Sequence, residues 1–349
     1  MKNRIIDLFC GAGGLSLGFE NAGYETILAV DFWEPAINTF NHNRKNKVGL
    51  VKNITTLDES FFEKYDLNSV FGIVGGPPCQ GFSMAGKRII DDDRNKLYRD
   101  YFRVLKIINP TFFVIENVTG ILNLNGGAVK EDIIKRSNET GYKVFIKTLC
   151  AVEHGVPQNR KRVFFIGIKK NNLNGEFIFP EELNNKISCE DAISDLPRLD
   201  LLEDNKKYRC DPQSDYQKMM RKNSQIVYNH EQSKHKKETI ETISHVPEGG
   251  GMKNIPEELR GNRNYSSLLR RMDRSKPSQT IDTGHRTYFH YEENRIISVR
   301  EAARLQSFPD TYEFLGSKQY QYKQVGNAVP PILAYEVAKS IRRYFAEEK

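Results

Sequence analysis

Short apolar runs alternate with amphipathic stretches over the first half of the chain. Glycine, proline or charged residues bound the apolar runs, which are residues 5–9, 27–30, 70–74, 112–116 and 163–168. Helical periodicity appears at residues 15–22 and 35–41. Strands that alternate with helices predict the α/β class, here a doubly wound and mostly parallel sheet.

The pattern changes over residues 172–292, where long apolar runs vanish and asparagine, lysine and arginine become frequent. Helical periodicity returns at residues 298–308 and in a long segment at 331–345. We therefore expect a main domain formed by residues 1–171 plus 293–349. A smaller, irregular and basic domain, residues 172–292, interrupts it.

Composition and charge narrow the class of protein. The 349 residues are 38% hydrophobic and 28% charged, which is typical of a globular protein rather than a membrane or disordered one. No apolar run approaches the length of about 20 residues that spans a bilayer, and no signal-peptide pattern precedes residue 5, so we expect a cytoplasmic protein. A net charge of +7 suits a polyanionic partner. The five cysteines lack zinc-binding spacing, and we predict no metal site.

A glycine-rich turn, residues 11–14, joins the first strand to the first helix. The dinucleotide pattern G-x-G-x-x-G would need glycine at position 16, which is Ser16. Asp31 ends the second strand, where an acid commonly holds ribose hydroxyls. These features favour a nucleoside cofactor that carries a carboxylate, such as S-adenosylmethionine, over a dinucleotide. A tight turn with no ligand is the alternative.

Candidate catalytic groups lie beside three later strands. Cys79 lies after two prolines in the turn Gly-Gly-Pro-Pro-Cys, which predicts a rigid and exposed thiol. Glu116 ends the apolar run at residues 112–116, and Arg160 and Arg162 precede the apolar run at residues 163–168. The alternatives are a buried structural cysteine (the interpretation we keep for Cys10, Cys150, Cys189 and Cys210), a helix-capping carboxylate and a solvated basic loop.

Six motifs, in this order along the chain, resemble those of a known protein family. They are D-L-F-C-G-A-G-G at 7–14, G-G-P-P-C-Q-G-F-S at 75–83, E-N-V at 116–118, Q-N-R-K-R at 158–162, V-R-E-A-A-R-L-Q-S-F-P at 299–309 and Q-V-G-N-A-V-P-P at 324–331. The chain resembles the DNA cytosine-5 methyltransferases of bacterial restriction–modification systems. The resemblance covers both ends of the chain and leaves residues 172–292 unmatched in detail.

The resemblance implies roles for the catalytic candidates. The Cys79 thiolate adds to C6 of a cytosine that has been flipped out of double-stranded DNA. Glu116 protonates or hydrogen-bonds N3, and Arg162 donates to the O2 carbonyl. Arg160 is expected to assist near a phosphate or the cofactor sulfur. The base that removes the C5 proton is left unassigned.

The resemblance also implies an S-adenosylmethionine site. Its residues are Phe9, Gly11, Gly14, Asp31, Phe32, Asn53, Ile54, Pro78, Leu97 and Asn327. Because position 327 lies near the C-terminus, the helix after Pro331 should pack beside the first strand. Three positions depart from the family's pattern: Asn53 replaces an acid, Asn95 replaces a glycine, and the adenine-stacking ring is either Phe32 or Trp33.

DNA contacts are expected in a loop after Cys79 and in the smaller domain, which would read the target sequence. The candidates are Gln80, Ser83, Lys87, Arg88, Arg94, Arg270, Arg271, Arg274, Thr280 and Arg286. A basic face that binds only phosphate is the competing interpretation for individual arginines.

The same residues disfavour other functions. An adenine amino-methyltransferase needs Asp or Asn before Pro-Pro-Tyr, and a transfer-RNA cytosine methyltransferase of this fold has a Cys-Phe-Thr element that is missing here. A catalytically dead binding protein typically lacks Cys79 or Glu116, and Ser16 disfavours a nicotinamide oxidoreductase. We expect a monomeric, nucleoid-associated enzyme that works alongside a separate restriction endonuclease.

Overall fold

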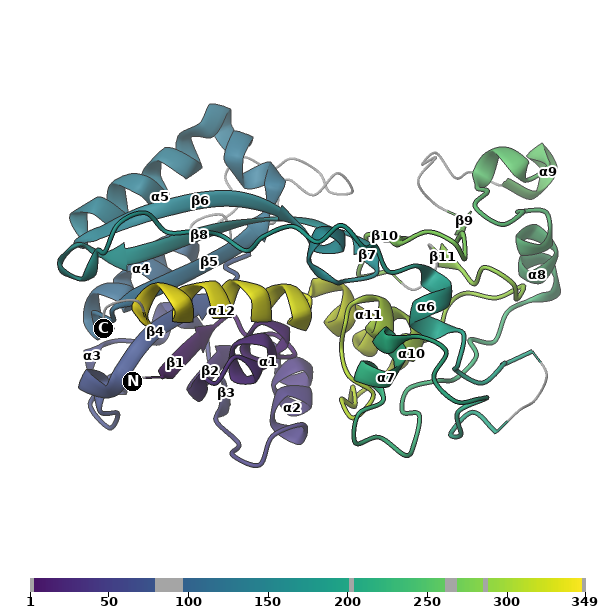
Figure 1. Ribbon diagram of the computed structural model, residues 1–349, viewed down its shortest axis with the longest axis horizontal. Helices are drawn as coiled ribbons and strands as arrows, with labels where there is room; N and C mark the ends of the chain where they lie inside the picture. Colours follow the sequence, from purple (N-terminus) through teal and green to yellow (C-terminus); the bar gives the residue numbers. More distant parts are fainter. Residues whose placement is uncertain (1–2, 79–96, 201–203, 261–268, 285–287, 347–349) are drawn as a thin grey trace. The chain divides into compact units, whose positions relative to one another are not determined.

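The computed structural model describes residues 3–78, 97–200, 204–260, 269–284 and 288–346. It divides into two compact units (Figure 1). The first unit comprises Met1–Cys150, Lys161–Glu182 and Pro331–Lys349. The second comprises Ala151–Arg160 and Leu183–Pro330.

A seven-stranded sheet forms the centre of the first unit, in the order β3-β2-β1-β4-β5-β8-β6. The strands are β1 (Arg4–Leu8), β2 (Glu25–Asp31), β3 (Gly49–Val51), β4 (Val70–Gly75), β5 (Phe112–Val118), β6 (Tyr142–Cys150) and β8 (Lys161–Lys169). Neighbouring strands from β3 to β5 are parallel, and β8 runs antiparallel to both β5 and β6. The prediction of an α/β fold with a mostly parallel sheet is confirmed.

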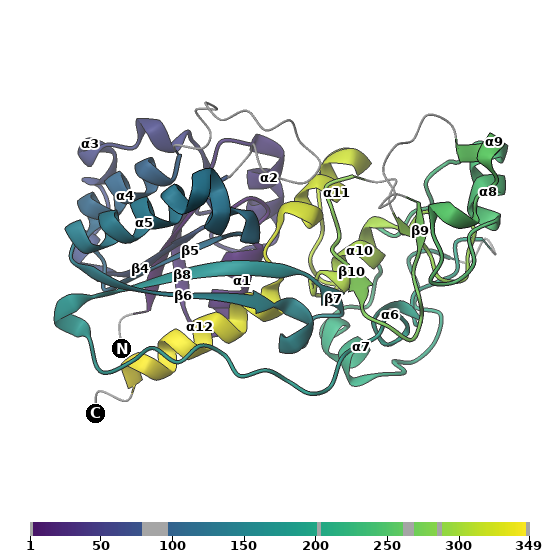
Figure 2. The ribbon, with the colours of Figure 1, turned by 90° about the horizontal axis from the view of Figure 1, so that it is seen from above.

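Helices cover both faces of this sheet (Figure 2). The helices of the unit are α1 (Gly14–Asn21), α2 (Glu34–His42), α3 (Glu59–Phe62), α4 (Leu97–Ile108), α5 (Ala128–Glu139) and α12 (Pro331–Ala346), with short 3₁₀ turns η1 (Ile54–Thr56), η2 (Leu67–Ser69), η4 (Thr119–Gly127) and η6 (Lys170–Asn172). Helices α4 and α5 lie on one side, and α1 and α12 on the other.

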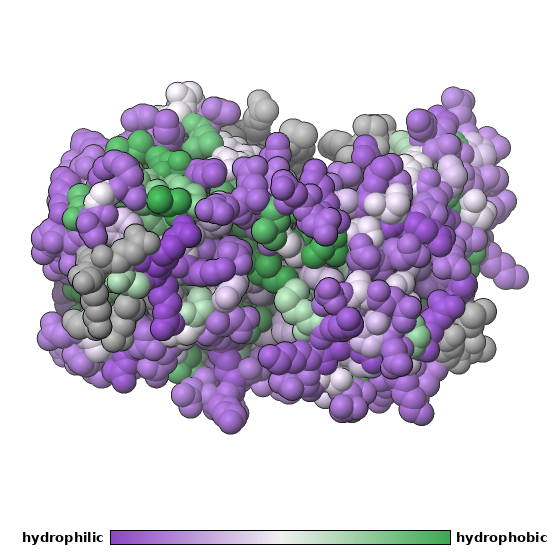
Figure 3. All heavy atoms as spheres, viewed as in Figure 1, coloured by the Kyte–Doolittle hydropathy of each residue, from purple (hydrophilic) through white to green (hydrophobic). Residues whose placement is uncertain are grey.

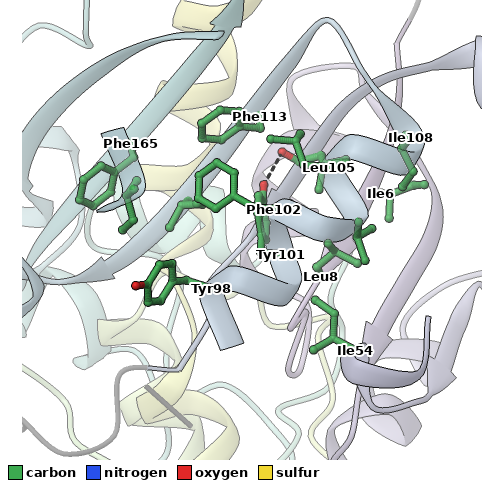
Figure 4. Packing of buried hydrophobic residues seen from close by; sticks show 14 of the residues in the cluster. Ile6, Leu8, Ile54, Tyr98, Tyr101, Phe102, Leu105, Ile108, Phe113 and Phe165 are labelled. Atoms are coloured by element: carbon green, nitrogen blue, oxygen red, sulfur yellow. Dashed lines mark hydrogen bonds between the residues drawn. The ribbon is translucent and has the colours of Figure 1, made fainter. Parts of the chain in front are cut away.

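The core between α4 and the sheet is strongly aromatic (Figure 4). Tyr101 and Phe102 of α4 pack against Phe113 of β5, with ring centroids 6.2 and 5.7 Å away. The fully buried Tyr101 hydroxyl lies 3.0 Å from the carbonyl oxygens of both Ile73 and Val114. This contact ties the helix to β4 and β5, the two strands that precede the candidate catalytic segments.

The C-terminal helix α12 returns to the first unit and packs against α1. At Gly18 of α1, a Cβ atom would come within 2.4 Å of the Ala334 side chain, so only glycine allows this approach. Further along α12, the Phe345 ring lies 5.0 Å from that of Phe71 in β4. We expected α12 beside the first strand, and its packing on α1 places it on the face of the sheet instead.

The second unit contains little regular structure. Its elements are η5 (Ala151–His154), β7 (Gln158–Asn159), α6 (Cys189–Ile193), α7 (Asp215–Met220), α8 (Lys237–Ser244), η7 (Met252–Asn254), α9 (Glu257–Arg260), β9 (Arg270–Arg271), β10 (Ser278–Gln279), β11 (Tyr288–Phe289), α10 (Val299–Leu305) and α11 (Lys318–Asn327). Its strands form two short parallel pairs, β10 with β7 and β11 with β9. The surface over α8 and α9 is mostly hydrophilic (Figure 3).

Buried ion pairs organise this irregular unit. Arg304 of α10 contacts Asp310 at 2.6 Å and Asp195 at 3.1 Å, and all three side chains are fully buried. Arg295 contacts Glu293 at 2.8 Å and Glu301 at 2.7 Å. Removing one partner of such a pair leaves an uncompensated buried charge, which destabilises a protein strongly.

The boundaries of the units differ from the expected domains. Residues 293–330 belong to the second unit, although we expected them in the main domain. One reason is the ion pair between Arg304 of α10 and Asp195, which lies within the expected irregular domain. Another is the hydrogen bond that the backbone N–H of Leu199 donates to Glu293 at 3.1 Å. The 172–182 segment belongs to the first unit, where the Tyr344 hydroxyl accepts from the backbone of Asn174 at 2.6 Å.

Protonation of His290 is expected to destabilise the second unit in acid. Burial lowers its pKa to about 3, against the opposing pull of Glu301. Because the folded value lies below the ordinary 6.5, the neutral histidine contributes fully above pH 6.5, and its contribution is lost as pH falls from 6.5 towards 3. The expected loss is about 1.4 kcal/mol per pH unit.

Urea unfolding between pH 7.5 and 5 measures this loss. A His290→Asn variant retains an acceptor for the backbone N–H groups of Glu292 and Glu293, which lie 3.2 and 3.1 Å from Nδ1. It should show a shallower dependence of unfolding free energy on pH than the parent protein. Equal slopes for the two proteins would contradict the prediction.

Within the part of the chain that the structure describes, no helix is both long and apolar enough to cross a membrane.

Candidate active site

Glu116 and Arg162 form an ion pair near the carboxyl end of β5, between two neighbouring strands of the central sheet. Glu116 lies in β5 opposite Phe164 of β8, and Arg162 lies two residues before Phe164, so both side chains share one face. Arg162 Nε lies 3.0 Å from Glu116 Oε1, and the two side chains are only 13% and 11% exposed. Burial lowers the pKa of the Arg162 guanidinium, and the Glu116 carboxylate opposes that shift.

This geometry excludes the capping interpretation of Glu116. β5 extends through Val118, which is the N-cap residue of η4, so Glu116 lies inside the strand rather than at a helix start. The pair therefore presents a carboxylate beside a guanidinium, a combination that offers hydrogen bonds of both polarities to a planar base edge.

The segment that precedes Cys79 is attached to this pair. Asn117 Nδ2 donates to the Pro77 carbonyl at 2.8 Å, and Asn117 is buried. At Gly76, a Cβ atom would lie 3.1 Å from Glu116 Oε2, so the absence of a side chain lets the backbone pass close to the carboxylate. Asn117 and Gly76 are not among the predicted site residues, although Gly76 lies in the motif at 75–83 and Asn117 in the motif at 116–118.

Several candidates lie outside the described residues, and their predicted roles remain predictions. They are Cys79, Gln80, Ser83, Lys87, Arg88, Arg94 and Arg286, together with the departure at Asn95. Among the other cysteines, Cys10 and Cys189 are buried as expected, Cys150 is half-buried, and Cys210 is exposed, contrary to the expectation.

Arg160 has a structural environment that differs from its expected catalytic one. It belongs to the second unit and is 1% exposed. Its Nη1 donates to the Ile281 carbonyl at 3.0 Å, and its Nη2 donates to the carbonyls of Gly326 and Ala328 at 2.7 and 3.2 Å. Because its terminal nitrogens serve three backbone carbonyls, Arg160 joins chain segments rather than presenting a cation to a phosphate.

The cofactor candidates of the first unit lie after the carboxyl ends of β1 and β2. The Asp31 carboxylate accepts from the Gly11 N–H at 2.9 Å and from the Trp33 N–H at 2.8 Å. A Cβ atom at Gly11 would meet no atom within 4 Å, so the loop backbone is open to a ligand. The Phe32 ring is 68% exposed beside this carboxylate. A carboxylate, an open backbone and an exposed ring fit the ribose, methionine and adenine portions of S-adenosylmethionine.

The remaining cofactor candidates of the first unit lie in the segments that follow its parallel strands. Exposed Asn53 accepts from the Thr55 N–H at 3.1 Å and caps η1, which begins at the buried Ile54. Half-buried Pro78 follows β4, and half-buried Leu97 begins α4. Phe9 is half-buried with a left-handed φ of 63°, and Gly14 begins α1. Asn327 is exposed in the second unit.

Among the described DNA candidates, Arg271 is not available to a ligand. It is 7% exposed, and it donates to the carbonyls of Val246, Ile243 and His290 at 2.6 to 2.9 Å. Arg270 is exposed at the neighbouring position. Arg274 contacts Glu248 at 3.1 Å, and the half-buried Thr280 donates to the Asn159 carbonyl at 2.7 Å.

This contrast between adjacent arginines predicts opposite effects of alanine. Arg271→Ala should lower the free energy of unfolding by about 3 kcal/mol, because several buried carbonyls lose their donor. Arg270→Ala should change it by less than about 0.5 kcal/mol and should weaken DNA binding. Urea unfolding and DNA titration measure the two effects. Similar stability losses in both variants would contradict the assignment.

Comparisons with known proteins place these features in a family. The model of the C-5 cytosine-specific DNA methylase family matches residues 3–343. The chain is 40% identical to the type II methyltransferase M.DdeI of Desulfomicrobium norvegicum, over 98% of this chain and 89% of that protein. It is 39% identical to the type II methyltransferase M1.HphI of Haemophilus parahaemolyticus, over 100% of this chain and 89% of that protein.

A solved structure agrees with the sequence matches. A DNA modification methyltransferase encoded within a prophage of Escherichia coli superimposes with a TM-score of 0.82 and 27% identity, covering 98% of this chain and 99% of that one. The family model covers nearly the whole chain, including the segments that hold Glu116 and Arg162. The chain therefore belongs to the C-5 cytosine-specific DNA methylases and is a DNA cytosine-5 methyltransferase of the restriction–modification type.

Proposed function

We propose that this enzyme transfers a methyl group from S-adenosylmethionine to C5 of a cytosine in a specific double-stranded DNA sequence, through a covalent bond between Cys79 and C6. The observation that carries the proposal is the Glu116–Arg162 pair, 3.0 Å apart and largely buried near the carboxyl end of β5. Asn117 links this pair to the backbone that leads into Cys79.

The chemistry follows from the electronic character of cytosine. C5 is a poor nucleophile, and addition of a thiolate to C6 gives it enamine character. The electron pair displaced from the C5=C6 double bond, now available at C5, would attack the methyl group, and the bond between that group and sulfur would break to leave a neutral thioether. Glu116 offers a proton or hydrogen bond at N3, and Arg162 donates to O2, so that charge developing in the ring is stabilised in a site with little water. Loss of the C5 proton and release of the thiolate complete the reaction.

The cofactor would be held by residues at the carboxyl ends of the first strands. Asp31 is suited to the ribose hydroxyls, Phe32 to the adenine ring and the Gly11 loop to the methionine part. When bound, S-adenosylmethionine supplies an electrophilic methyl group on a sulfonium. The protein residues orient that group towards the base and exclude water from it.

The DNA must present its cytosine outside the stack, because C6 is not accessible within a duplex. We propose that the second unit reads the target, with exposed Arg270 and half-buried Thr280 among its contacts. The described relatives are named type II methyltransferases. We accordingly propose that methylation protects DNA against a partner restriction endonuclease.

Bisulfite sequencing of plasmid DNA from expressing cells tests this function. Methylated cytosines resist conversion, so a fixed sequence context with one protected cytosine is the expected result. That context would also identify the recognition sequence. If soluble protein leaves every cytosine unprotected, while purified protein still binds S-adenosylmethionine, the proposed activity is wrong.

A further inference from the structure

A buried carboxyl group lies in the strand that leads into the candidate cofactor loop. Asp7 belongs to β1, is 0% exposed and precedes the Gly11 turn by four residues. Its Oδ2 accepts a hydrogen bond from Ser16 Oγ in α1. Its Oδ1 has no hydrogen-bond partner among the described residues. A buried carboxyl with an unsatisfied oxygen costs folding free energy, so its presence here calls for a functional reason.

The charged and titratable groups around Asp7 do not neutralise it by direct pairing. They come from each neighbouring element and are Glu20 of α1, Arg44 after α2, Asp31 of β2, Cys10 after β1 and Tyr101 of α4. Arg44 Nε lies 3.0 Å from Glu20, and its guanidinium lies 3.6 Å from the Phe40 ring centroid. Arg44, the cation that acts electrostatically on Asp7, is thus engaged by another carboxylate.

This environment leaves Asp7 near the midpoint between its protonated and ionised forms at neutral pH. Burial raises the pKa of Asp7 to about 7, while the Ser16 hydrogen bond and the more distant Arg44 oppose the rise. An added positive charge near the loop would favour the ionised form. Its removal would favour the protonated form again.

We propose that Asp7 makes the cofactor site prefer the positively charged S-adenosylmethionine over its uncharged product, S-adenosylhomocysteine. The inference rests on the proposed function, since it assumes that this cofactor binds at the Gly11 loop. The two molecules differ in one methyl group and in the charge on sulfur. A carboxylate within a low-dielectric core acts on such a charge over several ångströms without touching it.

Asp7 is expected to exchange a proton with solvent during each reaction cycle. When the sulfonium compound binds, a protonated Asp7 releases its proton to solvent and becomes a carboxylate. Methyl transfer leaves a neutral thioether, and the carboxylate takes a proton from solvent again. Asp7 therefore acts as a specificity-determining group through charge, and the product is held less tightly than the substrate.

Isothermal titration calorimetry with each of the two compounds tests the proposal. Asp7→Asn removes the charge and keeps an acceptor for Ser16 Oγ. At pH 7.5 it should weaken binding of S-adenosylmethionine about 10-fold and change that of S-adenosylhomocysteine less than about 2-fold. At pH 6.5, buffers of different ionisation enthalpy should reveal proton release on binding of S-adenosylmethionine to the parent protein but not to the variant.

Ser16→Ala is the matched control, because it removes the hydrogen bond and retains the carboxyl group. Because losing this hydrogen bond raises the pKa of Asp7 further, the control is compared with the parent protein at pH 9. The carboxyl group is ionised in both proteins there, and the ratio of the two affinities should be nearly the same. If Asp7→Asn weakens both compounds equally, or if Ser16→Ala changes the ratio as strongly, Asp7 has only a structural role and the inference is wrong. If neither compound binds the folded parent protein, the cofactor assignment itself fails. Thermal unfolding of each variant shows that the fold is retained.

Discussion

Replacing Cys79 with alanine is expected to abolish methyl transfer and to prevent covalent trapping on DNA. Without a thiolate, C6 receives no nucleophile and C5 never gains enamine character, so the rate should fall on the order of 10⁴-fold or more. Duplex DNA with 5-fluorocytosine at the target cytosine provides the direct measurement. After methyl transfer, fluorine at C5 cannot leave as a proton, and the protein stays attached to the base.

The parent enzyme should therefore form an adduct that survives denaturing electrophoresis, and Cys79→Ala should not. Cys210→Ala is a suitable control, because it removes a thiol that is exposed in the second unit and lies in none of the six motifs. It should trap DNA like the parent. An adduct that persists in Cys79→Ala would place the nucleophile elsewhere, whereas loss of the adduct in Cys210→Ala would implicate that second thiol.

Glu116→Gln is expected to reduce the turnover number by about 10²- to 10⁴-fold, with a smaller change in binding. The amide can hydrogen-bond to N3 but cannot deliver a proton to it. It also removes the charge that faces Arg162 at 3.0 Å. Single-turnover measurements with saturating DNA and cofactor separate the chemical step from binding.

A purely structural effect must be distinguished from this chemical one. Loss of the Glu116 charge leaves a buried guanidinium without its carboxylate, and such a change destabilises proteins. Urea unfolding of the variant measures that cost directly. Glu131→Gln, which removes an exposed carboxylate on α5 that lies 3.6 Å from Lys130, should affect neither turnover nor stability. A Glu116→Gln enzyme that turns over at the parent rate would remove Glu116 from the mechanism.

Much of the first unit could be predicted because its signals are local. The run at residues 27–30 lies within β2, and the pattern at 331–345 lies within α12. Strand and helix periods differ, and glycine or proline marks the turns between them, so neighbouring residues suffice to identify these elements. The motifs around Cys79 and Glu116 can likewise be recognised from residue types at short spacing.

Other features depend on which distant segments meet. The sequence contains no local signal that β8 runs antiparallel to β5, yet this register alone sets Arg162 beside Glu116. It also contains no signal that separates Arg270 from Arg271, of which only the second is buried. Adjacent strand positions face opposite sides, but which side is covered depends on the remaining chain.

The primary structure by itself therefore determined the α/β class, the order of the main elements and the family. Only the tertiary structure decided that Asn117 ties the Pro77 backbone to the Glu116 strand, that Arg160 and Arg271 serve backbone carbonyls, and that Asp7 is fully enclosed. Periodicity and turn chemistry are encoded between neighbours in the chain. Burial and ion pairing arise between residues that folding brings together, and they have no counterpart in any short stretch of sequence.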